Sequence, residues 1–112
     1  MPDKQSSVNT GDVYSINQIR NIVAPIAKRY NVNSVYLFGS YARGCATESS
    51  DVDLCVDAPA LRGMFGLGAL YADLEDALRK KLDLITFGSL KYNKDTRFLE
   101  NLRKDRVLLY EQ

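Results

Sequence analysis

Length, composition and charge narrow the range of proteins to which this chain can belong. Its 112 residues fit one domain with room for a core, and 46% hydrophobic with 26% charged residues exclude a disordered or fibrous chain. A net charge of +1 provides no global field for a polyanion, so we expect neither direct DNA or RNA binding nor membrane association.

The first predicted elements are a leader and an amphipathic helix. Residues 1–11 are polar and offer nothing that could pack, so we expect a flexible leader followed by a single domain over residues 12–112. Ser15 followed by Gln18 is a capping-box pattern, and apolar residues then recur at helical spacing. Pro25 removes a backbone donor inside this pattern, which predicts a kink or a restart of the helix.

A buried strand, a short helical turn and a second strand are expected next. Residues 35–38 are apolar on both faces, as in a strand covered by two layers. A brief helical turn over residues 40–43 then ends at Gly44. Polarity alternates with a period of two over residues 51–56, which predicts a strand with apolar side chains on one face and aspartates on the other.

Two helices and two strands are expected in the remainder. An apolar stripe predicts a helix over residues 67–81, and a strand follows over residues 82–87. A further helix is predicted over residues 95–104 and a last strand over residues 107–110. The stripe consists of Leu67, Leu70, Tyr71, Leu74, Ala77, Leu78 and Lys81. The expected fold class is α+β (mixed α/β), with a small mixed sheet of about four strands flanked by helices.

The C-terminal third is locally basic. Such a run is typical of a solvated helix face and less often marks a contact with a partner or nucleotide. The residues are Lys91, Lys94, Arg97, Arg103, Lys104 and Arg106.

The residue types that the chain lacks exclude several kinds of catalysis. There is no histidine, which rules out Ser-His-Asp and Cys-His catalysis and histidine-ligated zinc. No apolar run approaches the roughly 20 residues that span a bilayer, and no signal-peptide layout is present at the start. We therefore expect a cytoplasmic protein, in which Cys45 and Cys55 are free thiols.

Asp51 and Asp53 form a candidate metal site. They lie two residues apart on one face of the predicted strand, about 6.7 Å apart along the backbone, so their carboxylates can converge. Two close anions raise each other's pKa unless a cation intervenes, and oxygen-only ligands favour Mg²⁺ or Mn²⁺ over zinc. A pair of this kind on its own is as often a solvated strand face.

Gly39 and Ser40, upstream of this pair, add a candidate phosphate site. Glycine lets the backbone approach a ligand, and the first amides of the turn are unsatisfied donors for a phosphate. Ser40 adds a hydroxyl to this site, and the alternative is that it is simply the N-cap of the turn. Arg43, one turn later, could reach a phosphate or act as a salt-bridge partner. A phosphate cradle beside two carboxylates indicates phosphoryl or nucleotidyl transfer.

The run LFGSYARG at residues 37–44, continued by SDVDL at residues 50–54, resembles the signature of the polymerase-beta-like nucleotidyltransferase superfamily. It is most similar to the minimal nucleotidyltransferases, many of which are antitoxins that act on a HEPN-domain toxin. In that family a later strand supplies a third carboxylate, and Asp83 matches its position and its apolar flanks.

The resemblance implies a role for each candidate residue. Asp51 and Asp53 would bridge two Mg²⁺ ions, Asp83 would bind one of them and take the proton of the acceptor, and Gly39 and Ser40 would hold the β- and γ-phosphates of ATP. Arg43 is a secondary candidate for nucleotide binding.

Three functions compete at this point. The leading hypothesis is Mg²⁺-dependent transfer of AMP from ATP to a hydroxyl, a tyrosine, of a partner HEPN toxin. The alternatives are nucleotidyl transfer to a small molecule, as in aminoglycoside-modifying relatives, and a non-catalytic antitoxin that neutralises its toxin by binding alone. The sequence leaves a homo-oligomer and a hetero-oligomer both open.

Overall fold

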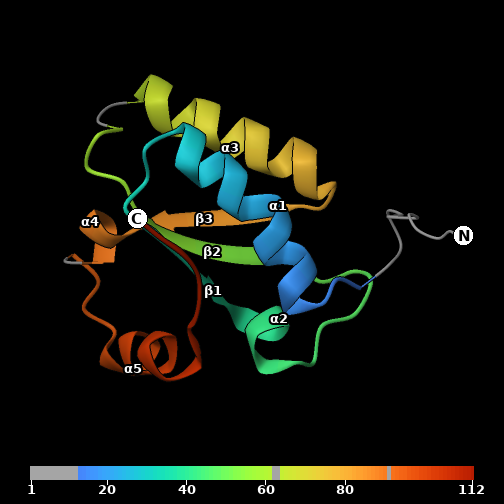
Figure 1. Cartoon of the computed structure of the whole chain (residues 1–112). Coiled ribbons are helices and arrows are strands. Elements are labelled where there is room, and N and C mark those ends of the chain that lie inside the picture. Colours follow the sequence, from blue (N-terminus) through green and yellow to red (C-terminus); the bar gives the residue numbers. More distant parts are fainter. Residues whose placement is uncertain (1–12, 62–63, 91) are drawn as a thin grey trace, which may run out of the picture.

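A mixed β-sheet lies at the centre of the structure (Figure 1). The computed structural model describes residues 13–61, 64–90 and 92–112, so the leader predicted for residues 1–11 lies outside the described residues. The strands are β1 (Ser34–Phe38), β2 (Val52–Asp57), β3 (Leu82–Thr86) and β4 (Val107–Glu111), in the order β3-β2-β1-β4. β1 is antiparallel to β2 and β4, whereas β2 and β3 are parallel. The predicted mixed sheet flanked by helices is therefore confirmed.

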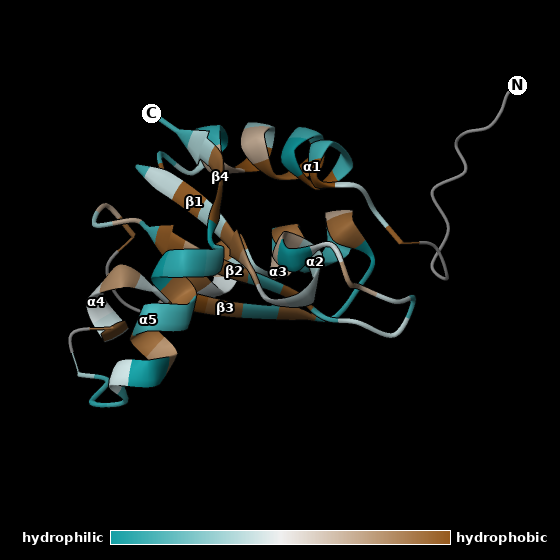
Figure 2. Cartoon of the chain, turned by 90° about the horizontal axis from the view of Figure 1, so that it is seen from below, coloured by the Kyte–Doolittle hydropathy of each residue, from teal (hydrophilic) through white to brown (hydrophobic). Residues whose placement is uncertain are grey.

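Helices cover the two faces of the sheet unequally. They are α1 (Ile16–Arg29), α2 (Gly39–Arg43), α3 (Met64–Leu78), α4 (Phe87–Leu90) and α5 (Thr96–Asp105). The long helices α1 and α3 lie side by side on one face, whereas α5 lies on the opposite face and α2 continues directly from β1 (Figures 1 and 2). The face of the sheet under α5 is covered less completely than the face under α1 and α3. Asp53 and Asp83 lie on this face.

The main core fills the space between the sheet and the layer formed by α1 and α3. Alternate residues of β1 and β2 point into the core, and three leucines one turn apart on α3 pack against them. The strands consist mostly of hydrophobic residues, which are brown in Figure 2. Fully buried members are Ile19, Val23, Val35, Leu37, Val52, Leu54, Val56, Leu70, Leu74 and Leu78. This packing holds the strands in register and so fixes the positions of the polar residues on the other face.

The capping box predicted at the start of α1 is confirmed. The Ser15 hydroxyl accepts from the Gln18 backbone N–H at 3.0 Å, and the Ser15 N–H donates to Gln18 Oε1 at 2.8 Å. Both bonds satisfy donors that the first turn of a helix leaves without partners.

The predicted restart of α1 at Pro25 is wrong, because the helix runs unbroken from Ile16 to Arg29. Pro25 and Asn21, whose carbonyl loses its helical donor, are both exposed, so water can hydrate that carbonyl. The next two residues, Ile26 and Ala27, are buried in the core and keep the last turns of the helix in place.

The predicted extent of α3 is also wrong at its C-terminal end. The helix stops at Leu78, because Arg79 adopts the left-handed conformation with φ of 59°. Lys81 therefore lies outside the helix, and Ala77 is exposed, so neither belongs to the buried stripe. The stripe is narrower than the sequence pattern indicates.

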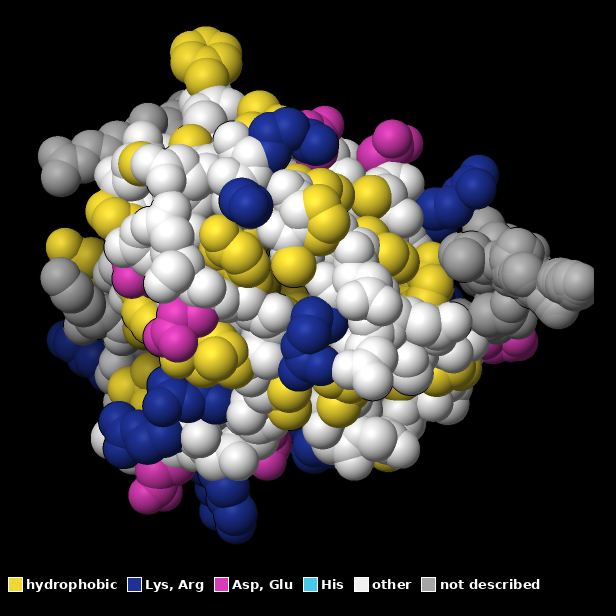
Figure 3. Space-filling view, in the orientation of Figure 1, with side chains coloured by type: hydrophobic (Ala, Val, Ile, Leu, Met, Phe, Trp, Pro, Cys, Tyr) yellow, Lys and Arg dark blue, Asp and Glu magenta, His cyan; other side chains and the backbone are white. Residues whose placement is uncertain are grey.

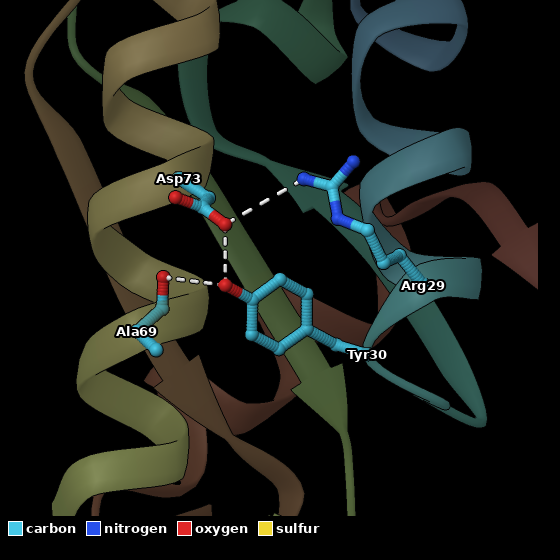
Figure 4. A network of polar contacts seen from close by, with 4 residues as sticks. All are labelled: Arg29, Tyr30, Ala69 and Asp73. Atoms are coloured by element: carbon cyan, nitrogen blue, oxygen red, sulfur yellow. Dashed lines mark hydrogen bonds and ion pairs between the residues drawn. The ribbon is translucent and has the colours of Figure 1, made fainter.

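A polar cluster ties the end of α1 to α3 (Figure 4). The Tyr30 hydroxyl donates to the Asp73 carboxylate and lies 3.3 Å from the Ala69 carbonyl oxygen. Arg29 pairs with the same carboxylate at 3.5 Å. The hydrogen bond to Asp73 and desolvation raise the pKa of Tyr30. The cluster lies on the face of the sheet opposite the aspartates, so its role is to join the two helices.

Helix α4 replaces the end of the predicted third strand. β3 ends at Thr86, whose side-chain oxygen accepts from the Ser89 N–H at 3.2 Å and so caps the turn that follows. The ring of Phe87 stacks on that of Tyr36 in β1, with 5.8 Å between centroids. This contact across the sheet face draws Phe87 out of the strand.

The two cysteines differ in their exposure to solvent. Cys45 is exposed and Cys55 is buried, and both are free thiols as expected; burial raises the pKa of Cys55 to about 12.

None of the helices in the described segments is long and apolar enough to cross a membrane. Lys and Arg side chains gather over α5, at the lower left of Figure 3, where the basic residues of that helix are exposed as predicted.

Candidate active site

The strand register places two of the predicted carboxylates next to each other. Asp53 of β2 pairs with Asp83 of the parallel strand β3, and on its other side with Phe38 of β1. Paired residues on adjacent strands point to the same face, and adjacent strands lie about 4.8 Å apart. Phe38, Asp53 and Asp83 therefore form one row across the face of the sheet that carries α5.

Gly39 lies directly under the Asp53 carboxylate. β1 ends at Phe38, and Gly39 turns the chain into α2 with φ of +72°, a left-handed conformation that favours glycine. A Cβ atom at Gly39 would lie only 2.0 Å from Asp53 Oδ2. Glycine is thus required twice at this position, once by the backbone turn and once by the approach of the carboxylate.

A cavity of about 300 Å³ opens over this row, between the sheet and α5. Four of the six predicted site residues line it: Gly39, Arg43, Asp53 and Asp83. The structure therefore brings together residues that lie more than 40 positions apart in the sequence.

Ser40 and Asp51 lie beside the cavity and are not part of its lining. Ser40 is half-buried within α2, whose N-cap is Phe38 without a side-chain hydrogen bond, so the N-cap interpretation of Ser40 is wrong. Asp51 is exposed and comes one residue before β2, whose first residue Val52 donates its N–H to the Lys81 carbonyl at 3.0 Å.

The loop that carries Asp51 is tied to the body of the protein by Lys80. This lysine is only 9% exposed, and its Nζ donates to the Glu48 carbonyl at 3.1 Å. The Ser50 hydroxyl accepts from the Thr47 N–H at 2.8 Å and closes the loop on itself. The position of Asp51 is therefore set by contacts that a sequence pattern does not reveal.

The electrostatics of the site centre on Asp53. Burial raises the pKa of its carboxyl, the charges of Asp83 and then Asp51 raise it further, and Arg43 opposes them. The three aspartates thus act on one another electrically, as the sequence predicts for carboxylates that share a site.

Arg43 forms an ion pair with Asp105 of α5, with 3.5 Å between Nη1 and Oδ2. Of the two roles considered for Arg43, the salt-bridge role is the one present in this structure. Half of the Arg43 side chain is still exposed, and both residues line the cavity. The pair joins α2 to α5 across the opening and holds a guanidinium where a phosphate could compete for it.

Sequence reasoning missed the contribution of α5 to the cavity. Phe98, Asn101, Leu102 and Asp105 form its outer wall, and Phe98 remains 38% exposed. The sequence predicts α5 only as a helix over residues 95–104 and does not indicate what its apolar side chains cover. The order of the strands indicates that α5 covers the site, because it determines the side of the sheet on which the helix between β3 and β4 passes.

The donor set fits a magnesium ion. Asp53 and Asp83 offer hard carboxylate oxygens in a partly buried site whose negative charge is uncompensated, and Mg²⁺ characteristically takes one or two carboxylates together with substrate phosphates and water. Within residues 13–61, 64–90 and 92–112, no three acidic or sulfur-bearing side chains are already gathered so that they could hold an ion by themselves. The two paired carboxylates are therefore the core of the candidate metal site, with Asp51 at its edge.

Comparison with known proteins extends this description. The profile of the family described as "Polymerase beta, Nucleotidyltransferase" matches residues 20–112. A relative from Methanocaldococcus jannaschii, named "Putative protein adenylyltransferase MJ0435", is 33% identical over 94 residues, which cover 84% of this chain and 91% of the relative.

Two solved structures have a similar fold. One is described as "Structure of putative minimal nucleotidyltransferase" and is 25% identical, with a TM-score of 0.65 over 87% of this chain and 98% of that one. The other is a tri-AMPylated Shewanella oneidensis HEPN toxin in complex with MNT antitoxin, in which a chain is 19% identical, with a TM-score of 0.60 over 87% of this chain and 73% of that one.

A mixed sheet with carboxylates on neighbouring strands, beside a Gly-Ser turn at the end of a third, defines the protein as a nucleotidyltransferase. More particularly, the chain belongs to the polymerase-beta nucleotidyltransferase family, and its fold is that of the minimal nucleotidyltransferases. The family, fold and enzyme class expected from the sequence are confirmed.

Proposed function

We propose that this chain is a Mg²⁺-dependent adenylyltransferase that transfers AMP from ATP to a tyrosine hydroxyl of a HEPN-domain toxin. The observation that carries the proposal is the pairing of Asp53 with Asp83 in one cavity beside Gly39. Nucleotidyl transfer needs carboxylates that hold divalent metal ions together with backbone donors for a triphosphate, and the residues of this cavity offer both.

Each side chain then has a defined task. The backbone at Gly39 and Ser40 receives the β- and γ-phosphates, and Arg43 exchanges Asp105 for a phosphate oxygen. The acceptor oxygen attacks the α-phosphorus, the bond from this phosphorus to the bridging oxygen breaks, and pyrophosphate leaves. Asp83 takes the proton of the acceptor hydroxyl.

Mg²⁺, when held by Asp53 and Asp83 with Asp51 at the edge, supplies positive charge that stabilises the entering and leaving oxygens. We expect Asp53 to depend on the ion most, because burial and then the charges of Asp83 and Asp51 raise the pKa of its carboxyl. Mn²⁺ is an acceptable substitute, since it takes the same oxygen ligands.

The choice of acceptor is supported by the related proteins. The Methanocaldococcus jannaschii relative bears the name of a protein adenylyltransferase, and the similar fold in the Shewanella oneidensis complex accompanies an AMPylated HEPN toxin. A protein partner also suits a small domain in which a shallow, open cavity has to receive a side chain carried by another molecule.

The test is to incubate the purified chain with α-labelled ATP, Mg²⁺ and the HEPN protein encoded beside it. We expect the partner to gain AMP on a tyrosine, and the Asp53→Asn variant to lose this transfer. Asp76→Asn is the matched control, because Asp76 is exposed on α3, across the sheet from the site.

The outcome also separates the competing hypotheses. Equal labelling by the Asp53→Asn variant would contradict the proposed mechanism. An unlabelled partner that this variant still neutralises at full strength would instead show a non-catalytic antitoxin, and labelling of an aminoglycoside in place of the partner would show a small-molecule enzyme.

A further inference from the structure

Lys80 is a buried lysine that the proposed mechanism does not use. It lies two residues after the end of α3 and is only 9% exposed. Burying an ammonium group costs free energy unless polar groups replace the water that it loses. In the part of the chain that the structure describes, the ion pairs are Arg29 with Asp73 and Arg43 with Asp105, and Lys80 joins neither. An apolar side chain would fill the same space at lower cost, so the ammonium group has to be explained by what it binds.

The Lys80 ammonium lies between a tyrosine ring and the loop that precedes β2. Its Nζ donates to the Glu48 carbonyl at 3.1 Å and lies 5.9 Å from the centroid of the Tyr14 ring. Tyr14 is itself buried, and its hydroxyl donates to the carbonyl of Leu78, the last residue of α3. An aromatic face attracts a cation, and so does the C-terminal end of a helix. The Tyr14 ring and the end of α3 therefore favour the ammonium at this place, and its hydrogen bond goes to the loop.

The turn between α3 and β3 has an unusual backbone. Arg79 has φ of 59°, a conformation that residues other than glycine rarely adopt. Arg79 and Lys81 are exposed, whereas Lys80 between them is buried. A backbone of this kind persists only where the surrounding contacts hold it. The hydrogen bond from Lys80 to the loop is one such contact, so the turn and the loop stabilise each other.

The same turn contacts the chain on both sides of Asp51. Lys80 binds the loop three residues before Asp51, and the Lys81 carbonyl accepts from the Val52 N–H at 3.0 Å, one residue after it. Asp83 follows two residues later on β3. Because β2 and β3 are parallel, the loop before β2 and the end of α3 lie at the same end of the sheet (Figure 1). The turn thus connects the segment that carries Asp51 to the strand that carries Asp83.

The loop has few other attachments. The Thr47 N–H donates to the Ser50 hydroxyl at 2.8 Å, and the Ser50 N–H donates to the Thr47 carbonyl at 3.0 Å, but both bonds stay within the loop. Among the described residues, Lys80 supplies the only hydrogen bond that joins residues 46–51 to another part of the chain. Without this bond, Asp51 would be held from its C-terminal side alone.

We infer that Lys80 is a positioning residue, which fixes Asp51 relative to Asp53 and Asp83 and so sets the geometry of the metal site. The inference rests on the proposed function, because it takes Asp51 to contribute to holding Mg²⁺. It also predicts a sign that electrostatics alone would reverse. A lysine repels a metal ion, so loss of its charge by itself would strengthen metal binding, whereas loss of the hydrogen bond to the loop weakens it.

Substitutions of Lys80 test the inference. Lys80→Met keeps the apolar stem and removes the ammonium, and Lys80→Arg keeps a charged donor. Lys80→Gln, polar but shorter, takes the place of Lys80→Met if the methionine variant does not fold. Lys28→Met is the matched control, because it removes the same group from an exposed position on α1. Thermal unfolding verifies the fold of each variant.

Two measurements do not depend on catalysis. Hydrogen exchange of residues 45–51, followed by mass spectrometry in the metal-free protein, reports the order of the loop. Titration with Mn²⁺ alone, followed by the electron paramagnetic resonance signal of the free ion, reports metal affinity. The Mg²⁺ concentration that gives half-maximal AMP transfer then connects both results to the reaction.

We expect Lys80→Met to exchange the loop amides at least about threefold faster and to bind Mn²⁺ about three- to tenfold more weakly. The Mg²⁺ requirement for transfer should rise by a similar factor. Lys80→Arg should restore most of the affinity, and Lys28→Met should match the wild type. In the Asp51→Asn background, Lys80→Met should cause no further loss, because the residue through which it acts is already changed.

Each failure has its own signature. If the wild-type chain binds Mn²⁺ no better than the Asp53→Asn variant, the proposed function fails and Lys80 has no metal site to position. If the wild type binds Mn²⁺ but Lys80→Met leaves loop exchange or Mn²⁺ affinity unchanged, only the positioning role is overturned. A further loss of affinity in the Asp51→Asn background would also overturn it, because Lys80 would then act on the fold rather than through Asp51.

Discussion

At the scale of single residues, the site depends on one unusually close approach. Gly39 lies under the Asp53 carboxylate, and both a left-handed backbone and the absence of a side chain are needed there. Asp53 in turn has a raised pKa because it is partly buried and faces two other carboxylates. Substitution of each of these two residues therefore has its own expected effect.

Gly39→Ala should reduce the rate of transfer strongly and the stability of the fold moderately. The new Cβ would lie 2.0 Å from Asp53 Oδ2 and would displace the carboxylate. A displacement of about 1 Å costs on the order of a hundredfold in rate, and a non-glycine residue in this conformation costs about 1–3 kcal/mol of stability. Transfer rates and urea denaturation measure the two effects.

Gly44→Ala separates backbone strain from the clash. Gly44 has a similar φ of +78°, but a Cβ there meets no atom within 4 Å. The variant should lose a similar amount of stability and keep its activity. Equal loss of activity in both variants would mean that the contact with Asp53 is irrelevant to catalysis.

Asp53→Asn should stabilise the metal-free protein at neutral pH. The pKa of Asp53 is raised in the folded state above its ordinary value. The contribution of this carboxyl to stability is therefore fully present only below the ordinary pKa, and it is lost as the pH rises through the folded-state pKa. The charged carboxylate therefore destabilises the fold at pH 7, and because solvent screens this partly buried group, removing it should add no more than about 1 kcal/mol.

Urea denaturation as a function of pH tests this sign. The advantage of Asp53→Asn should shrink as the pH is lowered from 7 to 4, and Mg²⁺ should stabilise the wild-type chain but not the variant. A variant less stable than the wild type at pH 7 without metal would show that the carboxylate is held by favourable contacts instead.

At the scale of elements, one face of the sheet forms the core and the other forms the candidate site. α1 and α3 bury the apolar face and carry most of the packing, whereas α2 and α5 meet over the polar face through the pair Arg43–Asp105. Changes on the first face should therefore alter stability alone, and changes on the second should alter ligand binding.

Pro25→Ala should stabilise α1 without changing activity. Alanine restores the backbone donor to the Asn21 carbonyl in an exposed part of an unbroken helix. Proline is about 3 kcal/mol less favourable than alanine inside a helix, and the adapted surroundings reduce the expected gain to about 1–3 kcal/mol. Thermal unfolding measures the gain, and Lys28→Ala, exposed on the same helix, should change little. An unchanged midpoint for Pro25→Ala would mean that the helix is already distorted there.

Asp105→Asn should strengthen binding of a triphosphate. The substitution frees Arg43 and removes a negative charge from the cavity wall. Because half of the Arg43 side chain is exposed and the charged atoms lie 3.5 Å apart, the effect is modest, roughly two- to fivefold in the affinity for tripolyphosphate. Glu100→Gln, exposed on the same helix, is the control for charge. Weaker binding by Asp105→Asn would show that Asp105 orients Arg43 for the ligand rather than competing with it.

The elements that sequence reasoning predicted well are those with strong periodicity. The capping box of α1, the strand before Gly39 and the alternation around Asp53 each reflect a local rule, and all three are found in the structure. The end of α3, the short helix α4 and the unbroken path through Pro25 were missed because contacts with distant residues decide them, such as the Phe87 ring on Tyr36. Local patterns carry no information about such contacts.

At the scale of the whole molecule, strand order assembles the site. Parallel pairing of β2 and β3 sets Asp53 beside Asp83, and antiparallel pairing with β1 brings Gly39 to the same end of the sheet. The motif predicted which residues would meet, but the covering of the cavity by α5 and the pairing of Arg43 with Asp105 follow only from the complete topology.

The most direct measurement is a crystal structure of this chain with Mg²⁺ and a non-hydrolysable ATP analogue. We predict Asp53 and Asp83 oxygens about 2.0–2.1 Å from a shared ion, with the β- and γ-phosphates against Gly39 and Ser40. A structure in which the nucleotide binds elsewhere, or in which Asp83 turns away from the ion that Asp53 holds, would contradict the account.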